Sequence, residues 1–129
     1  MRNRTNEQGT RPMQRHAWAA AQTDVPPAPR WVLFALTDRA SASGLAYPLR
    51  STIARDVGMQ PDTVGRHLAV LAEERHHLIE RVRLRRGGQL RGWLYRVLVP
   101  GSSPVDPGEL PRIVPDGFEL PAAWTEPVA

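Results

Sequence analysis

Residues 49–68 read LRSTIARDVGMQPDTVGRHL, and this stretch decides the predicted fold. Leu49, Ile53 and Val57 are spaced four residues apart, so they lie on one stripe of a predicted helix. Gly58 comes next, at the position where a glycine in the left-handed conformation commonly ends a helix. This part of the stretch therefore predicts a short amphipathic helix that ends in a tight turn.

A second helix should follow directly. Pro61 suits its first turn, because the N–H group that proline lacks has no helical partner there. Val64, Leu68 and Leu71 continue an apolar stripe, and we expect the helix to extend over residues 61–75.

The sequence before this pair predicts one more helix. Residues 30–40 (RWVLFALTDRA) carry an apolar face with polar residues behind it. Residues 45–47 are apolar but stop at Pro48, so they form at most a very short strand. We expect the apolar residues of the three helices to share one core: Val32, Leu33, Leu36, Ile53, Val57, Val64, Leu68 and Leu71.

Two β-strands should come after the helices. Residues 78–84 alternate apolar and charged side chains, and residues 93–99 are rich in β-forming residues. Gly87 and Gly88 lie in the loop between them and favour a hairpin turn. The predicted order is thus three helices and then a β-hairpin.

This order resembles the winged helix-turn-helix family. The stretch 49–68 is similar to the family pattern of a helix, a glycine, an apolar residue, a short polar residue, two variable positions, Thr-Val and, four positions on, Leu. Residues 32–48 resemble the first helix and the following segment of phage and plasmid replication proteins and small bacterial regulators. The resemblance covers about residues 30–100. It implies an α+β fold, mainly α, of three helices with a β-hairpin wing.

The resemblance also implies a DNA-binding surface. In DNA-bound members of the family the third helix lies in the major groove. Arg66 is then the best candidate to contact guanine, and Gln60 to contact adenine. The expected phosphate contacts come from the third helix and from the start of the second: Arg50, Ser51, Thr52 and Thr63, with charge added by Arg55.

The predicted hairpin is rich in arginine. Arg81, Arg83 and Arg85 recur at a spacing of two, which places them on one strand face. Arg86, Arg91 and Arg96 lie near the tip or on the return strand, and we expect this hairpin of residues 80–96 to contact DNA. The alternative is a solvated polar face that protects an edge strand.

Charge is unevenly distributed along the chain. Residues 30–100 hold twelve Arg against six acidic residues, whereas residues 101–129 hold one Arg against five. A basic middle with an acidic end suggests a polyanion-binding domain with an appendage.

Both ends resemble flexible tails. Residues 1–29 are predicted to form a flexible arm with a short helix at residues 16–23. Residues 101–129 are acidic and rich in proline, which argues against regular structure. Glu109-Leu110-Pro111 recurs as residues 119–121. The repeat is a candidate docking motif for a protein partner, although composition favours a tail that is disordered or packs loosely on its own domain.

Other functions find little support in the sequence. The chain has no Cys, and no grouping of catalytic residues occurs in the folded segment, so we expect a protein that is not an enzyme and has no cofactor. His67, His76 and His77 have no partners at metal-ligand spacing, and we expect no metal site. No apolar run is long enough to span a membrane, so we expect a cytoplasmic protein.

The expected partner is double-stranded DNA, bound by a bacterial transcriptional regulator or by a replication-type protein of a mobile element. A homodimer that reads a palindrome is a further expectation, with Trp18 and Trp31 as the large apolar groups best placed to mediate it. The alternative from another class is an adaptor that binds proteins through its helices or its Pro-rich tail.

Overall fold

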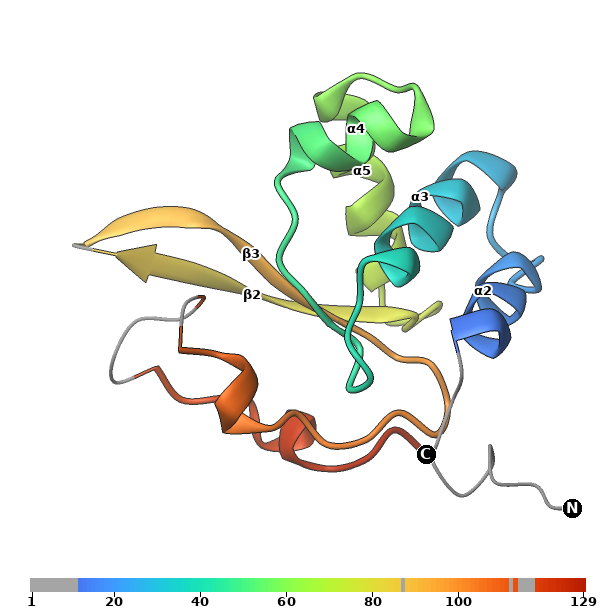
Figure 1. Ribbon diagram of the computed structural model, residues 1–129. Coiled ribbons are helices and arrows are strands. Elements are labelled where there is room, and N and C mark those ends of the chain that lie inside the picture. The colour runs from blue at the N-terminus through green and yellow to red at the C-terminus, as the bar shows by residue number, and fades with distance from the viewer. Residues whose placement is uncertain (1–11, 87, 112, 114–117) are drawn as a thin grey trace, which may run out of the picture.

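The computed structural model describes residues 12–86, 88–111, 113 and 118–129. Within them the chain is α+β, with four helices and a three-stranded antiparallel sheet (Figure 1). The helices are α2 (Pro12–Ala20), α3 (Pro27–Asp38), α4 (Arg50–Val57) and α5 (Pro61–Ala72). The strands are β1 (Leu45–Ala46), β2 (Ile79–Arg86) and β3 (Gln89–Val97), and the 3₁₀ turns η1 (Pro107–Glu109) and η2 (Ala122–Thr125) follow them.

The turn between α4 and α5 has the predicted form. Gly58 has a φ of 71°, in the left-handed region, and its N–H donates to the carbonyl oxygen of Ala54. Pro61 is the first residue of α5. The prediction for Leu49 is wrong, because this residue is extended and precedes the first turn of α4. It therefore leaves the stripe of Ile53 and is 66% exposed.

α5 ends at Ala72, before the predicted end at residue 75. The N–H of His77 donates to the carbonyl oxygen of Glu73 at 2.7 Å, which closes a turn after the helix. His77 has a φ of 47°, an uncommon conformation for a residue with a side chain. The turn redirects the chain into β2.

β3 is the central strand of the sheet, and β1 and β2 pair with it on either side. The predicted hairpin of β2 and β3 is confirmed, but its strands reach further towards the tip, to Arg86 and from Gln89. The predicted loop of residues 85–92 is therefore too long. Arg86 pairs with Gln89, so only two residues separate the strands. The register shifts between Arg83 and Arg85.

One face of the sheet packs against the helices. Ile79, Tyr95 and Val97 contribute to this first core from the strands. From the helices the predicted residues Val32, Leu33, Leu36, Ile53, Val64, Leu68 and Leu71 are at most 1% exposed, while Val57 is half-buried. Each such side chain contributes about 1.5–3 kcal/mol relative to leaving it in water.

α2 corrects the prediction for the N-terminal arm. Residues 1–11 lie outside the described part of the chain, but residues 12–29 belong to the fold. Ala19 and Val25 are 0% and 1% exposed in the first core. α3 begins at Pro27, so Pro27 and Pro29, which the prediction placed in the flexible arm, make the first turn of a helix instead.

A buried arginine explains why α2 docks. The guanidinium of Arg15 donates to the carbonyl oxygens of Thr37 and Ala40, at 3.2 and 2.6 Å, where α3 ends. Cations are favoured at the carbonyl end of a helix. Burial lowers the pKa of Arg15.

The described part of residues 101–129 covers the opposite face of the sheet, below the strands in Figure 1. Trp124 and Leu110 are 1% and 6% exposed in a second core that includes Leu84 and Leu94 of the hairpin. This corrects the prediction of a flexible appendage. Alternate residues of β2 and β3 give the sheet a second apolar face, and that face needs a cover.

The Glu-Leu-Pro repeat serves the fold. Leu110 is buried in the second core and Leu120 packs against its edge. The carboxylate of Glu109 accepts hydrogen bonds from the hydroxyl groups of Ser41 and Ser43, at 2.7 and 3.0 Å. The apolar residues of the repeat are thus used within this chain.

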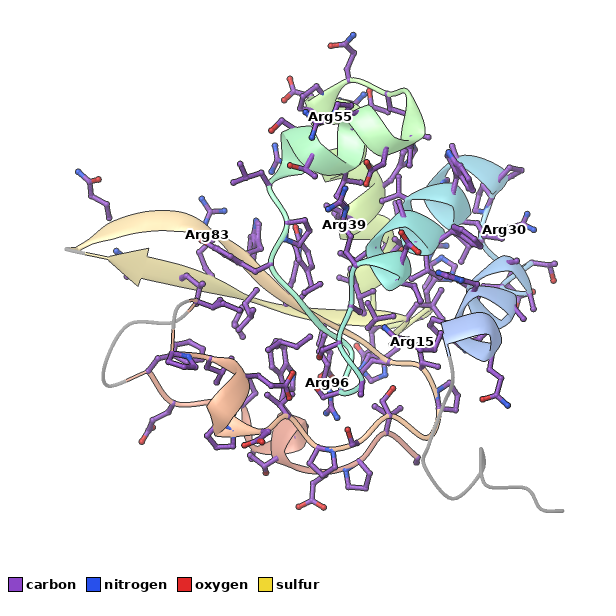
Figure 2. The ribbon with its side chains drawn as sticks, viewed as in Figure 1. Arg15, Arg30, Arg39, Arg55, Arg83 and Arg96 are labelled. Atoms are coloured by element: carbon purple, nitrogen blue, oxygen red, sulfur yellow. The ribbon has the colours of Figure 1, made fainter. Side chains whose placement is uncertain are left out.

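Arg96 fastens the C-terminal segment to the sheet. The residue is 2% exposed, and its guanidinium donates to the carbonyl oxygens of Ser43, Ser103, Ala123 and Glu126, at 2.8 to 3.1 Å. Burial lowers its pKa, and nearby carboxylates oppose that shift. Figure 2 shows Arg96 on the side of the C-terminal segment and Arg83 on the side of the helices. The prediction that Arg96 adds to the DNA-binding charge is therefore wrong.

Candidate nucleic-acid interface

The outer face of α5 carries the residues predicted to contact bases. Gln60, Asp62 and Arg66 are exposed, and Thr63 is half-buried. Arg66 Nη2 donates to Thr63 Oγ1 at 3.1 Å, one helical turn away, so both side chains share one face. Gln60 immediately precedes the helix. The face offers several hydrogen-bond donors in a row, which suits the acceptors on base edges.

The start of α4 lies beside this face. Arg50 and Ser51 are exposed, and Thr52 is half-buried. The first N–H groups of a helix have no helical partners, and the dipole makes this end positive. The predicted phosphate contacts at residues 50–52 are thus accessible.

Gly65 lets the two helices share one cationic group. A Cβ atom at Gly65 would lie 2.8 Å from Cζ of Arg50, so the Arg50 guanidinium rests on α5 at the position where a side chain is missing. In the sequence alone, Gly65 is only a helix position without a side chain. Residues so far apart in the chain carry no signal of this contact.

The helix side of the hairpin holds a stack that the sequence reasoning missed. The guanidinium carbons of Arg81 and Arg83 lie 4.3 and 4.9 Å from the centroid of the Trp93 ring. Arg83 is paired with Trp93 across the strands, and Arg81 is two residues along on the same face. Such contacts contribute about 0.5–1 kcal/mol at exposed sites and hold the two cations in place.

A pocket of about 180 Å³ joins the hairpin to the helices. Arg50 and Arg83 stand on its walls, together with Tyr47, Trp93 and Tyr95. Burial raises the pKa of the Tyr95 hydroxyl, and the positive charges of the surrounding arginines oppose that rise. The pocket therefore marks a junction where a cation from α4, Arg50, meets a cation from the sheet, Arg83.

The arginines of this surface are not neutralised by carboxylates within the described residues. The ion pairs found there are His16–Asp38, Arg39–Asp56, Arg75–Glu73 and His77–Glu80. None includes Arg50, Arg66, Arg81 or Arg83. Arg50 and Arg83 share the pocket, Arg81 and Arg83 stack on the same Trp93 ring, and Arg66 follows Gly65 on the exposed face of α5. These four arginines are named here the arginine surface.

The remaining predicted residues are less well placed. Arg85 is exposed near the hairpin tip, and its guanidinium donates to the carbonyl oxygen of Gly88 at 3.2 Å. The side chains of Arg86 and Arg91 fall outside what the structure describes, so their part in the surface stays a prediction. Arg55 is exposed on α4, at the top of Figure 2.

The histidines do not converge. Burial and the neighbouring Arg66 both lower the pKa of His67. His77 Nε2 lies 2.9 Å from a carboxylate oxygen of Glu80. Across the described residues, no three His, Cys, Asp or Glu side chains lie together as metal ligands.

A separate apolar surface lies on the outer side of α3. Trp31 is 48% exposed, and its ring stacks on Phe34 with centroids 5.3 Å apart. Trp18, the other residue predicted to mediate a dimer, is half-buried against the first core.

None of the described helices is long and apolar enough to cross a membrane.

Comparison with protein-family models, with curated proteins and with solved structures found no match.

Proposed function

We propose that this chain is a winged helix-turn-helix protein that binds duplex DNA. The order α3, β1, α4, α5, β2, β3 and the tight turn at Gly58 support this fold. In the proposal α5 is the recognition helix, and the β2–β3 hairpin is the wing. The resemblance of the sequence favours a bacterial regulator or a replication-type protein of a mobile element, with binding and not catalysis as its activity.

The observation that carries the proposal is the continuity of the arginine surface. Arg50 rests on α5 at Gly65 and shares a pocket with Arg83 of the hairpin. Three elements that are separate in the sequence thus present one run of cations. DNA offers a matching run of phosphates, and neutralising them releases counterions.

Each group has a proposed role set by its chemistry. Arg66 points out from the recognition helix and can bind guanine through its two-pronged guanidinium. Arg50 and the hydroxyl groups of Ser51 and Thr52 contact the phosphate backbone. Arg81 and Arg83, held on Trp93, bind phosphates where the wing meets the duplex.

The opposite face of the sheet supports this orientation. The segment that covers this face carries the acidic residues Asp106, Glu109, Glu119 and Glu126. The positive charge on the same face of the sheet, Arg96, is buried. A polyanion is attracted to the side of the helices and repelled from the side of this segment.

The exposed Trp31 favours a second candidate function, an adaptor or dimer surface. Pro27, Arg30, Trp31 and Phe34 line an apolar hollow of about 440 Å³ between α2 and α3. In the described part of the C-terminal segment, Val105, Leu110 and Trp124 are buried in the second core, which leaves the α3 face as the better adaptor surface. A protein that binds only partners here should show no salt-dependent affinity for duplex DNA.

The test is binding of the full chain to labelled duplexes across a range of salt concentrations. We expect the double variant Arg81→Gln/Arg83→Gln to bind all duplexes more weakly. Its slope of log affinity against log salt should fall by about two charges.

The matched control is Arg30→Gln/Arg75→Gln. It removes the same charge away from the arginine surface, since Arg30 lies beside α2 (Figure 2) and Arg75 comes after the end of α5 in the sequence. We expect an unchanged slope. If the salt slope fell equally in both variants, the effect would come from net charge and not from the arginine surface. If the unaltered chain bound no duplex, DNA binding would be refuted and the adaptor function would be the remaining candidate.

A further inference from the structure

The pocket between the hairpin and α4 has aromatic walls. Its volume is about 180 Å³, and three aromatic residues, Tyr47, Trp93 and Tyr95, line it. Trp93 and Tyr95 belong to β3, and Tyr47 lies between β1 and α4. For comparison, an apolar cavity of about 150 Å³ holds one benzene molecule. The pocket therefore has room for one six-membered ring with a small substituent.

Gly92 brings two walls of the pocket together. A Cβ atom at Gly92 would lie 3.8 and 3.9 Å from Oη and Cε1 of Tyr47, so the ring of Tyr47 lies against β3 at this point. Gly92 also has a φ of 111°, a backbone conformation that residues with a side chain rarely adopt. A larger residue is therefore disfavoured at position 92, and the Tyr47 ring keeps its place on the strand.

Positive charge meets these aromatic walls. Arg50 and Arg83 line the same pocket, and none of its described lining residues is acidic. Neither arginine belongs to the ion pairs of the described residues. Burial raises the pKa of the Tyr95 hydroxyl, and the charges of the surrounding arginines, Arg81, Arg50 and Arg83, oppose that rise. The pocket thus combines aromatic walls with two positive charges and a hydroxyl group that stays protonated at neutral pH.

We propose that this pocket binds a small aromatic carboxylate, a ligand with one planar ring and one negative charge. The ring packs against Tyr47 and Trp93, since aromatic rings favour offset-stacked or edge-to-face contacts. The carboxylate lies between Arg50 and Arg83, because guanidiniums bind carboxylates through charge-assisted hydrogen bonds. The ligand thus uses both kinds of group that the pocket offers.

The combination of walls and charges selects this ligand over others. Acetate or inorganic phosphate would reach the guanidiniums but leave the aromatic walls without a partner. A neutral ring would fill the pocket but gain nothing from its two positive charges. A nucleotide adds a sugar and a phosphate group to its base, and the whole exceeds a pocket only slightly larger than a cavity for benzene.

Binding of this ligand has a consequence for DNA. In the proposed function Arg50 and Arg83 contact phosphates, so a carboxylate held between them competes with the duplex for both guanidiniums. The coupling is reciprocal: the ligand lowers the affinity for DNA by the same factor by which DNA lowers the affinity for the ligand. This consequence rests on the proposed function, whereas binding of the ligand to the free chain does not.

The first test titrates the full chain with benzoate and with two controls. Benzamide keeps the ring but has no charge, and acetate keeps the charge but has no ring. The NMR signals of the Trp93 indole and the Gly92 amide report on the pocket, and the indole of Trp31 on α3 is the reference. We expect benzoate to bind with a dissociation constant of about 1 mM or less, at least about tenfold more tightly than either control.

Three outcomes of this titration would overturn the proposal. The first is that benzoate causes no saturable shift at Trp93 and Gly92. The second is that benzoate binds no more tightly than acetate or benzamide. The third is a shift of equal size at Trp31, which would mean that benzoate contacts exposed aromatic rings without a site.

The variant Arg83→Gln removes one of the two cations. The side chain is exposed, so the variant should fold, and circular dichroism checks this. We expect benzoate to bind about tenfold more weakly, while Arg75→Gln, which loses the same charge outside the pocket, binds it as the unaltered chain does. An equal loss in both variants would contradict a carboxylate site at Arg83.

The last test measures the affinity of the full chain for a labelled duplex in sodium benzoate and in sodium acetate at the same concentration. We expect the affinity to be about threefold or more lower in benzoate, because a phosphate contact is lost. If the chain binds benzoate but its affinity for DNA is the same in both salts, competition is refuted. If the chain binds no duplex in either salt, the proposed function fails, and the NMR titration alone decides whether the pocket binds the ligand.

Discussion

The two faces of the hairpin use the same residue types for opposite purposes. On the helix side, Arg81 and Arg83 stack on Trp93 and keep their charge at the surface. On the other side, Arg96 is buried and donates to four carbonyl oxygens, while Trp124 is buried beside it. An arginine on a strand thus either keeps its charge at the surface or holds a covering segment through buried hydrogen bonds, and what covers its face of the sheet decides which.

Because the two faces of the hairpin differ in this way, we expect the largest effect of a substitution at Arg96, on the free energy of unfolding. Arg96→Met keeps the length of the side chain but leaves the four carbonyl oxygens without their donor. We expect a loss of about 3–5 kcal/mol in the free energy of unfolding, because buried polar groups lose their partners. Urea unfolding followed by circular dichroism measures this.

Arg83→Met is the control on the other face. The side chain is exposed, so we expect a loss of less than about 1 kcal/mol. Similar losses in the two variants would mean that the faces do not differ in the way described.

The second effect in size concerns the side that faces DNA in our proposal. Arg66→Ala should cost about 1–3 kcal/mol in binding to the preferred duplex and much less on random duplexes, because a base contact carries the specificity. A competition assay with both duplexes measures the difference. An equal loss on both would make Arg66 a phosphate contact.

Much of the fold was predictable because its signals are local. Three local signals define the paired helices: the place of Ile53 in an apolar stripe, the glycine at position 58 and the proline at position 61. The structure confirms both helices. The very short strand before Pro48 also follows from local rules.

The tails were not predictable in this way. Prolines forbid helices and central strands, but they do not forbid packing. The segment after β3 contributes single large side chains such as Trp124 and Leu110. They stabilise the fold only because the sheet offers an apolar face that other parts of the chain form. The N-terminal helix likewise depends on carbonyl groups at the end of α3, which Arg15 reaches.

The candidate site was predictable residue by residue but not as a surface. Exposure of Arg50, Arg66 and Arg83 follows from helix and strand periodicity. That these side chains come together does not follow from periodicity. The contact of Arg50 with Gly65 and the stack on Trp93 depend on how the elements pack.

The third effect tests that junction. Gly65→Ala places a Cβ against the Arg50 guanidinium, which is the mobile end of a long side chain and moves aside. The helix should gain up to about 1 kcal/mol in stability from the better helix former. The salt slope for DNA binding should fall by about one charge. Thermal unfolding and DNA titration measure the two quantities.

Ala69→Gly on the exposed side of the same helix is the control. It should cost about 1 kcal/mol in stability and leave the salt slope unchanged, because Ala69 lies one turn further along α5 than Gly65 and does not line the pocket that holds Arg50. If Gly65→Ala also left the salt slope unchanged, the result would contradict a DNA contact of Arg50.

The smallest effect concerns the acidic side. Glu119 and Glu126 lie on the segment that covers the far face of the sheet, and elements packed on opposite faces are about 10 Å or more apart. The Debye length at physiological salt is about 8 Å, so their repulsion of DNA is largely screened. Glu119→Gln/Glu126→Gln should therefore raise DNA affinity less than about twofold. Asp62→Asn removes only one charge, yet on the exposed face of α5 it should raise the affinity more. If the pair on the far side had the larger effect, the acidic segment would compete for the arginine surface. The packing of that segment against the second core would then be only one of its states.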